Sequence, residues 1–520
     1  MSEDIKQEVE EAKKAEAEAI QAATDKPIEI TRSLRKECIH ANERGDASLL
    51  VTLKPYQHIY GKDSGDWYYY VNPYYELDKG CLQISESVED VAVEIEKEVS
   101  CLEEEANKLR SGEDSEAKLK RLEKKIDGVR KRTYSLRGQA RIRNVVSLAK
   151  NFLSLPDNVF DSNPFLLAHE SGVVDLRTGR NKPGRPEDYC LKHCLVALDD
   201  IDAEPEKWIQ ALLEIFNQDE EMVYFMQRVL GSTLLGFPNR KLFSFEGPGG
   251  NNGKTTICEK VAEILGDYAV AIRSEMLMDS YMVSPNSPSP ETMALMGARF
   301  VWTSETREGA KYDIAKVKQL TGNDTMVGRR PHDKYETRFK PSHSLILLTN
   351  NKPHANADDA AFWRRVVSIP FEISFVDYEP QKETEKPINP NLNEELAQEN
   401  SAILAWLVRG CFEYQEVGLD PPQKVIDATM EYHAEEDYIG AFIDEVLEER
   451  PGVNISASEL HAYFEVWYRE NIGKYPPKQK TFGSRVKKRL DNKRGSRCVE
   501  YLNIYPNEDW QQRMEGKGVV

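Results

Sequence analysis

The stretch Phe245–Thr256 (FEGPGGNNGKTT) combines a run of glycines with a Gly-Lys-Thr ending. Glycines let backbone N–H groups turn toward an anion, a lysine neutralises phosphate charge, and the hydroxyl after it can ligate Mg²⁺. The strict phosphate-loop pattern, G-x-x-x-x-G-K-[ST], requires a glycine where Pro248 stands, and Gly247 comes one position too early. The stretch therefore predicts either a nucleotide site with a lengthened loop or a glycine-rich turn that contains GKT.

A short apolar strand is expected over 242–246 and a helix over about 254–265, the elements that a phosphate loop joins. We therefore expect ATP and Mg²⁺ as ligands, with Thr255 and Glu305 at the metal. The residues expected to bind the nucleotide are Gly247, Gly249, Gly250, Asn251, Asn252, Gly253, Lys254, Thr255 and Thr256.

Polar residues also end the apolar runs that follow the loop. Glu305 comes directly after RFVWTS, where a carboxylate can order Mg²⁺ or polarise the attacking water. Asn350 ends SLILLT, where an amide can sense the γ-phosphate. Arg364 and Arg365 precede the apolar run VVSIPF and are candidates for a finger inserted into a neighbour's nucleotide site. Taken singly, the glutamate could cap a helix and the arginines could form a structural ion pair, but their order along one α/β pattern favours catalysis.

The charge of the chain is unevenly distributed. The net charge of −19 argues against general nucleic-acid binding, yet two windows, 329–340 and 474–497, are strongly basic. Binding depends on local patches rather than on the average. An acidic body with two basic regions suits a protein that touches DNA in particular places, although a solvated charged face would explain either window alone.

Several classes of protein are disfavoured by composition. No apolar run is long enough for a membrane span, and the acidic N-terminus lacks the apolar stretch of a secretory signal. Cys190 and Cys194 lie close together, but no second pair completes a zinc set, so buried thiols in a reducing cytoplasm are the favoured interpretation.

Hydrophobic periodicity divides the chain into regions of different character. A helical hairpin is expected between 91 and 153, and strand–helix alternation over 236–376 predicts an α/β domain with a largely parallel sheet. The expected organisation is an acidic tail over 1–27, an accessory N-terminal region over 28–205, an ATPase domain over 206–376, a linker with helices over 377–436, and a compact C-terminal unit over 437–510.

The segment 208–371 resembles a superfamily 3 helicase of the phage, plasmid and poxvirus primase-helicase type. The motifs that carry the resemblance are GPGGNNGKTT, RFVWTSETREG, KVKQLTGNDTMVGRR, RFKPSHSLILLTNN and DDAAFWRRVVSIPF. The likeness extends over about 30–506, because GVVDLRTG fits the region before such helicases and the C-terminal unit fits their winged-helix tail. The loop departs from the family by one additional asparagine, so either Gly247 is displaced or the loop bulges at Asn251 and Asn252.

The resemblance implies an AAA+-like P-loop NTPase core with a parallel sheet, followed by a C-terminal winged helix. It implies an ATP-dependent replicative DNA helicase of a phage, plasmid or other mobile element, acting in the cytoplasm of a bacterial or archaeal host. The resemblance implies a homo-hexameric ring that moves 3′ to 5′ on single-stranded DNA and also binds duplex DNA. A separate primase or polymerase is a candidate partner, although the family often fuses primase and helicase in one chain.

The resemblance also assigns the two basic windows. A hairpin over 328–338 would point into the ring channel, and the winged helix would use a third helix, TFGSRVKKRL, after helices over 438–449 and 456–471. Residues expected to contact DNA are Lys318, Arg329, Arg330, His332, Lys334, Arg485, Lys487, Lys488 and Arg489. An exposed basic turn or a solvated basic helix is the alternative. Arg365 is the expected finger toward the adjacent subunit, and Arg364 is expected to pair with a local carboxylate.

Two further functions stay open. A primase-helicase would need a carboxylate pair on a strand, but Asp200-Ile201-Asp202 leads into Pro205 and reads as a helix cap. An origin-binding initiator that uses ATP only as an assembly switch is disfavoured by Glu305 together with the arginine pair.

Overall fold

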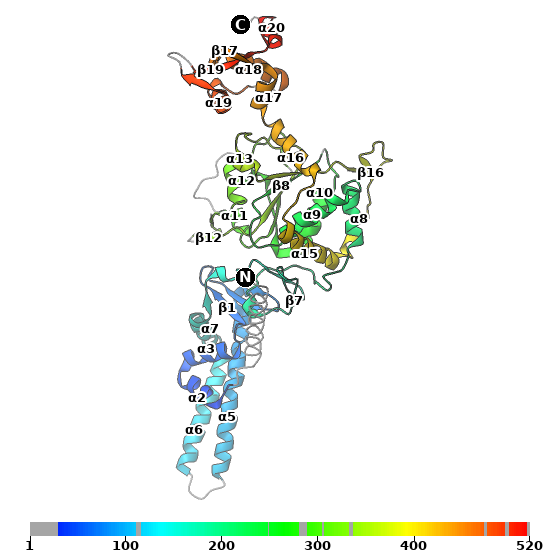
Figure 1. The fold of residues 1–520 in the computed structure, drawn as a ribbon. Helices are drawn as coiled ribbons and strands as arrows, with labels where there is room; N and C mark the ends of the chain where they lie inside the picture. Colours follow the sequence, from blue (N-terminus) through cyan, green and yellow to red (C-terminus); the bar gives the residue numbers. More distant parts are fainter. Residues whose placement is uncertain are drawn as a thin grey trace, which may run out of the picture. The chain divides into compact units, whose positions relative to one another are not determined.

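The computed structural model describes residues 30–110, 116–247, 249–279, 289–303, 306–331, 336–472, 476–494 and 499–516. The predicted tail over 1–27 lies outside these residues. The chain divides into two compact units, Met1–Ser162 with Pro183–Leu191, and Asn163–Lys182 with Lys192–Val520 (Figure 1). Among the described residues, no helix combines the length and apolar character that crossing a membrane requires.

The predicted domain boundary near 205 differs from this division, because residues 163–182 belong to the second unit. They form a small antiparallel sheet of β5 (Leu166–His169), β6 (Gly172–Asp175) and β7 (Asn181–Lys182). Leu167 and Val174 of this sheet are fully buried in the main core of the second unit.

The first unit is built around the predicted helical hairpin, which is confirmed. Helices α5 (Val88–Arg110) and α6 (Glu116–Leu136) pack along each other, and the apolar stripe of α5 is buried. Residues spaced three and four apart lie on one face of a helix, which is why this stripe meets its partner. The surrounding helices are α2 (Arg32–His40), α3 (Asn42–Leu53), α4 (Leu82–Glu86) and α7 (Gln139–Leu153).

A small sheet of the first unit contains the aromatic cluster. Its order is β3-β2-β1-β4, with bounds His58–Gly61 for β1, Trp67–Tyr70 for β2, Tyr75–Leu77 for β3 and Ser154–Leu155 for β4. Within the aromatic stretch 66–78, β2 and β3 form an antiparallel pair. Tyr68 and Tyr75 are buried against Phe160, with ring centroids 4.7 and 5.6 Å apart respectively. These rings pack within the fold, as aromatic pairs at this spacing do.

The second unit contains a five-stranded sheet of order β14-β8-β13-β10-β9, in which every pairing is parallel. The strands are β8 (Leu242–Glu246), β9 (Ala269–Ile272), β10 (Phe300–Thr303), β13 (Ser344–Thr349) and β14 (Val366–Pro370). The predicted α/β class with a parallel sheet is therefore confirmed. Because parallel strands run the same way, the segments that follow them all leave at one edge of the sheet.

Helices cover both faces of this sheet (Figure 1). Side chains alternate along each strand, so Phe243 and Phe245 face one core while Leu242 faces the other. The first face carries α8 (Glu206–Ile215), α9 (Glu220–Ser232) and α10 (Lys254–Leu265). The second carries α12 (Ile314–Leu320) and α13 (Ala360–Trp363), and α11 (Pro290–Ala294) lies beside the hairpin described below.

The segment 377–436, predicted as a linker with helices, is part of the α/β core. Helix α15 packs on α9, and α16 packs on β14. The α9–α15 contact is close because Gly231 and Gly410 face the opposing backbone, and a Cβ on Gly231 would lie 2.3 Å from the Cys411 nitrogen. The elements here are β15 (Ser374–Val376), β16 (Glu385–Pro387), α14 (Leu392–Ala397), α15 (Asn400–Val417) and α16 (Gln423–Glu435).

The C-terminal segment has its own hydrophobic core and a three-stranded sheet of order β17-β19-β18. Two predicted helix ends are wrong. The first helix stops at Val446 and the chain continues as a strand, and the third stops at Val486, before Lys487. The elements are α17 (Tyr438–Val446), β17 (Leu447–Ser456), α18 (Ala457–Asn471), α19 (Gln479–Val486), β18 (Asn492–Arg494), β19 (Val499–Pro506) and α20 (Glu508–Gly516).

Candidate functional site

The glycine-rich loop leaves the carboxyl end of β8 and enters α10, which begins at Lys254. Gly249, Asn251 and Gly253 adopt left-handed backbone conformations, with φ of 71°, 59° and 83°. Glycine occupies this region without steric cost, and asparagine tolerates it better than most residues. The additional residue is thus accommodated at positions whose side chains permit the turn. A Cβ on Gly253 would also lie 2.5 Å from Ile215 Cδ1, so a larger residue would have to displace the Ile215 side chain as well as adopt the left-handed conformation.

Lys254 and Asn350, predicted from separate segments, meet at this edge of the sheet. Lys254 is 4% exposed, and its ammonium donates to Asn350 Oδ1 at 2.8 Å, to Asn252 Oδ1 at 3.1 Å and to the Gly247 carbonyl at 3.4 Å. Lys254 and Asn350 come close because β8 and β13 are neighbouring parallel strands. Glu246 at the end of β8 lies opposite Thr349 at the end of β13, so the segments after both strands start side by side. A buried cation beside a loop of exposed glycines can bind an anion such as a phosphate.

The start of α10 provides the remaining expected ligands. Thr255 is exposed in the first turn, and Gly249 and Gly250 are exposed in the loop. The N-terminal turn of a helix leaves backbone N–H groups unpaired and carries partial positive charge, which favours phosphate. Glu305, the other expected Mg²⁺ ligand, lies outside the described residues, as does Pro248.

The loop is fastened to the segment that follows β14. Asn252 Nδ2 donates to the Ile373 carbonyl at 2.8 Å, and the Phe375 N–H donates to the Asn251 carbonyl at 2.8 Å. Asn252 is only 2% exposed. The sequence predicted Asn252 as a nucleotide contact, and its partners in the distant segment 373–375 gave no local signal.

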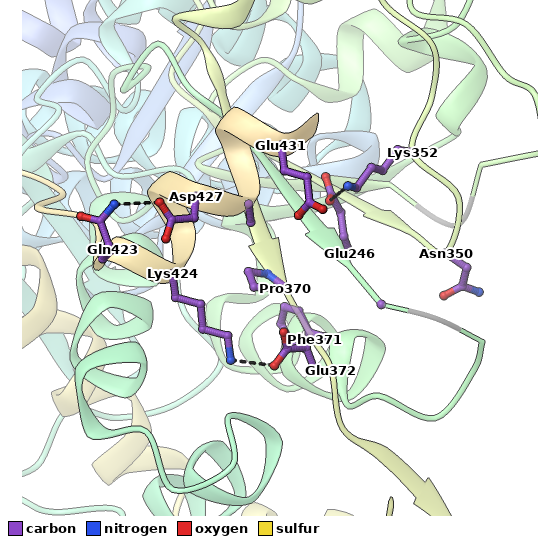
Figure 2. A pocket seen from close by; sticks show the side chains of 12 residues that line it. Glu246, Asn350, Lys352, Pro370, Phe371, Glu372, Gln423, Lys424, Asp427 and Glu431 are labelled. Carbon is purple, nitrogen blue, oxygen red and sulfur yellow. Dashed lines mark hydrogen bonds and ion pairs between the residues drawn. The ribbon is translucent and has the colours of Figure 1, made fainter. Parts of the chain in front are cut away.

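A cavity of about 620 Å³ opens beside the loop, between the ends of β8, β13 and β14 and helix α16 (Figure 2). Glu246 lies in its wall, and sequence analysis missed this residue because it reads as the last residue of a strand. Its Oε2 accepts from Ser368 Oγ at 2.6 Å and lies 4.0 Å from the Lys352 ammonium, while Oε1 has no hydrogen-bond partner among the described residues. Burial raises the pKa of Glu246, and Ser368 and Lys352 oppose that rise.

The two candidate finger arginines lie at the opposite edge of the sheet from the loop. They directly precede β14, which runs parallel to β8. Val366 lies opposite Leu242 at the start of the two strands, and Pro370 lies opposite Glu246 at their end. At about 3.3 Å per residue, β8 separates this edge from the loop by roughly 16 Å. Neither arginine therefore lies beside the phosphate loop of its own chain.

The environments of the two arginines reverse the sequence-based preference. Arg365 is half-buried and its Nη1 donates to the Ala361 carbonyl at 2.5 Å. Arg364 is exposed, and no ion pair joins it to a described residue, so the expected pairing with a local carboxylate is not found. Arg364 is thus the more available of the two for another molecule.

The predicted basic hairpin is present in the described residues as β11 (Met326–Gly328) paired antiparallel with β12 (Thr337–Phe339). Its expected tip residues, His332 and Lys334, lie outside the described residues. Arg330 is exposed and Arg329 is half-buried. Lys318 donates to Asp359 Oδ2 at 2.6 Å, so its charge is already paired with the carboxylate that caps α13.

The four expected DNA contacts of the C-terminal segment fall into two groups. Lys487 and Lys488 are exposed after the end of α19, although the Lys488 ammonium lies 4.0 Å from Asp358 Oδ2. Arg485 contacts the hydroxyl of Tyr438 and lies 5.1 Å from the centre of its ring. Arg489 lies 2.9 Å from Asp358 Oδ1 and 2.7 Å from Asp437 Oδ1. Arg485 and Arg489 are thus held by contacts within the chain.

The Asp200–Asp202 pair and the cysteine pair show no metal-site geometry. The Asp202 N–H donates to Asp200 Oδ1 at 3.0 Å, which is a turn rather than two carboxylates facing one ion. Cys190 and Cys194 are both buried. Within the described part of the chain, no group of three or more His, Cys, Asp or Glu side chains is placed to hold a metal ion.

Comparison with known proteins adds evidence of ancestry. Residues 47–217 match the family model described as "D5 N terminal like". "Putative helicase L207/L206" of Acanthamoeba polyphaga mimivirus is 28% identical over 346 residues, which cover 64% of this chain and 36% of the relative. These matches are consistent with a primase-helicase of the D5 type. The resemblance indicated by the chain's motifs is confirmed.

Other similar proteins come from further large DNA viruses. "Putative helicase 022R" of Frog virus 3 is 24% identical over 387 residues, covering 60% of this chain and 40% of the relative. "Putative primase C962R" of African swine fever virus is 23% identical over 331 residues, covering 60% and 34%. The chain thus spans between about a third and two fifths of the length of these relatives. They are viral, and a phage or plasmid origin in a bacterial or archaeal host stays a prediction.

Among solved structures, the chain is similar to the C-terminal region of NrS-1 in its A form without ligand. The TM-score is 0.37 at 14% identity, and the match covers 66% of this chain and 84% of that one.

Proposed function

We propose that the protein is an ATP-dependent replicative DNA helicase of a DNA virus or other mobile element. The observation that carries the proposal is the meeting of Lys254 and Asn350 at the carboxyl edge of a parallel sheet, next to a glycine loop that opens a helix. In this arrangement the loop N–H groups and Lys254 would bind the β- and γ-phosphates, and Asn350 would sense the γ-phosphate. Thr255 and Glu305 would hold Mg²⁺, which neutralises charge on the transferred group.

In this proposal the site of ATP hydrolysis is made by two adjacent subunits. Charge on the transferring phosphoryl group needs a further cation, and a finger arginine can be worth about 10³-fold or more in rate. Arg364, at the far edge of the sheet, would supply it to the adjacent subunit of a homo-hexameric ring. An AAA+-like P-loop core is supported by the parallel sheet with its glycine loop.

DNA binding is assigned to the two basic regions. The β11–β12 hairpin, with Arg330 and the tip residues His332 and Lys334, would track single-stranded DNA through its phosphates, with movement 3′ to 5′ as in similar helicases. The C-terminal order of α17, β17, α18, α19, β18 and β19 supports a winged helix for duplex DNA. Lys487 is the most available cation there, and Lys488 is exposed but lies 4.0 Å from Asp358.

A second candidate is a primase-helicase, in which this chain itself makes primers, favoured by the African swine fever virus relative being named a primase. A separate primase or polymerase as partner fits the first candidate instead. Primer synthesis by the isolated chain on single-stranded DNA separates the two, because only an intrinsic primase yields labelled oligonucleotides.

The test of the leading proposal is ATP hydrolysis with and without single-stranded DNA, together with strand displacement on a forked duplex. We expect hydrolysis that DNA stimulates, and displacement that requires ATP and Mg²⁺. Lys254→Ala should lower hydrolysis by at least about 10²-fold, as loss of a group that stabilises transition-state charge does. Lys382→Ala, at a lysine whose side chain is 74% exposed, is the matched control and should behave like the wild type. Normal turnover in Lys254→Ala would refute the nucleotide site.

A further inference from the structure

The lengthened phosphate loop makes contacts that the nucleotide itself does not need. Its two consecutive asparagines differ sharply, since Asn251 is exposed with a left-handed backbone and Asn252 is buried. The carbonyl of Asn251 and the side chain of Asn252 both reach the segment Ile373–Phe375, which follows β14. The additional residue therefore lets the loop join a neighbouring strand as well as turn.

The side chain of Asn252 is engaged at both ends. Its Nδ2 donates to the Ile373 carbonyl at 2.8 Å and contacts Ser374 Oγ at 3.3 Å. Its Oδ1 accepts from the Lys254 ammonium at 3.1 Å. A primary amide offers two donor hydrogens and one acceptor oxygen, so one face of the amide is fixed to the strand segment and the other faces the lysine.

This arrangement addresses a weakness of lysine as a phosphate ligand. The lysine side chain has a flexible four-carbon stem and a compact charge, and it loses much rotamer freedom when it is held in one place. In this loop the ammonium is held by Asn252, and Asn252 in turn is fixed by backbone and side-chain atoms outside the loop. The ordering of Lys254 is thus already present before any ligand binds.

We propose that Asn252 is a positioning residue that aims Lys254 at the phosphates and fastens the loop to the strand segment after β14. It acts through Lys254 and does not contact the nucleotide. This inference rests on the proposed function, because it assumes that Lys254 binds phosphate.

The test is a double-mutant cycle on ATP affinity, measured by calorimetry on the full chain with Mg²⁺. The four proteins are the wild type, Asn252→Ala, Lys254→Ala and the double variant. Asn252→Ala should weaken ATP binding about tenfold in the wild-type background, a typical value for one hydrogen bond to a charged group. In the Lys254→Ala background the same change should have little effect, because interacting residues are non-additive.

Equal losses in the two backgrounds would overturn the proposal, since they would make Asn252 an independent nucleotide ligand. No loss in the wild-type background would overturn it as well. Unchanged ATP affinity in Lys254→Ala alone would instead refute the proposed nucleotide site, so the two failures are distinguishable. Ser374→Ala, which removes only the longer contact, is the matched control and should keep most of the affinity. If thermal unfolding shows that Asn252→Ala does not fold, Asn252→Ser takes its place in the same cycle.

Discussion

At the scale of single residues, Glu246 is the least expected feature of the site. It ends β8 directly before the phosphate loop and lines the cavity beside α16. Its carboxyl is 9% exposed, with one oxygen bonded to Ser368 and the Lys352 ammonium at 4.0 Å. Burial disfavours the charged form of a carboxyl, which is why the pKa of Glu246 is raised.

Because the pKa of Glu246 is raised, we expect Glu246→Gln to change the free energy of unfolding by an amount that depends on pH. Between the unfolded and the folded pKa the folded state binds more protons, so the free energy of unfolding contributed by this group falls as pH rises through that window. Glutamine does not ionise and escapes this loss. The stability of Glu246→Gln relative to the wild type should therefore increase with pH, measured by urea unfolding between about pH 4 and pH 8.

Glu372→Gln, at a carboxyl that is 57% exposed on the same cavity, controls for the loss of one negative charge. A stability difference between Glu246→Gln and the wild type that stays constant over this pH range would contradict the prediction.

Residues whose positions follow from the sheet could be predicted from the sequence, and those that depend on long-range contacts could not. Lys254 and Asn350 each follow a strand, and parallel strands deliver such residues to one edge. Asn252 and Glu246 depend on Ile373 and Ser368, which lie more than a hundred residues later in the sequence and give no signal at either position. The sequence likewise carried no signal of the contact between Arg365 and the Ala361 carbonyl, which leaves Arg364 the more available of the two arginines.

At the scale of elements, the α9–α15 contact shows how the segment after the sheet joins the core. The two helices meet through Gly231 and Gly410, where a Cβ on Gly410 would lie 2.2 Å from the Gln227 carbonyl oxygen. Backbone opposes backbone at this crossing, so no side chain can move aside.

Gly231→Ala should therefore destabilise the second unit by about 1–3 kcal/mol, the usual cost of overpacking. Scanning calorimetry of the full chain should show the affected transition at a lower temperature. Gly128→Ala in α6 is the matched control, because nothing lies within 4 Å of the added Cβ. Removing a glycine from an open helical position should stabilise the first unit by roughly 0.5–1 kcal/mol. Equal effects at the two positions would contradict the packing argument.

The spacing of apolar residues predicted the helices and strands that have strong periodicity. It failed where an element is fixed by pairing with a segment that is distant in the sequence. The hairpin of α5 and α6 and the strands of the parallel sheet follow their apolar spacing. Residues 447–449 were expected to extend a helix, yet they form the start of β17 because they pair with β19, more than fifty residues later. The role of α15 was missed for the same reason, since its partner α9 precedes the sheet.

At the scale of the whole molecule, the proposal of shared active sites predicts complementation between inactive chains. Lys254→Ala lacks the phosphate cation and Arg364→Ala lacks the finger, so each should be inactive alone. In mixed rings some interfaces combine an intact loop with an intact Arg364, and we expect ATPase activity to be partly regained. Steady-state hydrolysis after co-assembly measures this.

Arg365→Ala provides the contrast, because Arg365 is bonded to the Ala361 carbonyl of its own chain. Loss of that contact acts within one subunit and should not be complemented by Lys254→Ala. If Arg364→Ala fails to complement in rings shown to be mixed, the arginine acts elsewhere and the shared-site model is wrong.

The separation of Arg364 from the phosphate loop by the length of β8 also bears on the symmetry of an assembly with shared sites. Across a two-fold axis, residue i of one chain meets residue j of the other and j meets i, so two chains can complete each other's sites and growth stops at the pair. In a head-to-tail contact each chain gives its arginine to one neighbour and receives one from another. Contacts of that kind either close into a ring or continue as a helical filament. A change that alters the angle between neighbours would therefore convert rings into filaments, and it would not stop assembly at a symmetric pair.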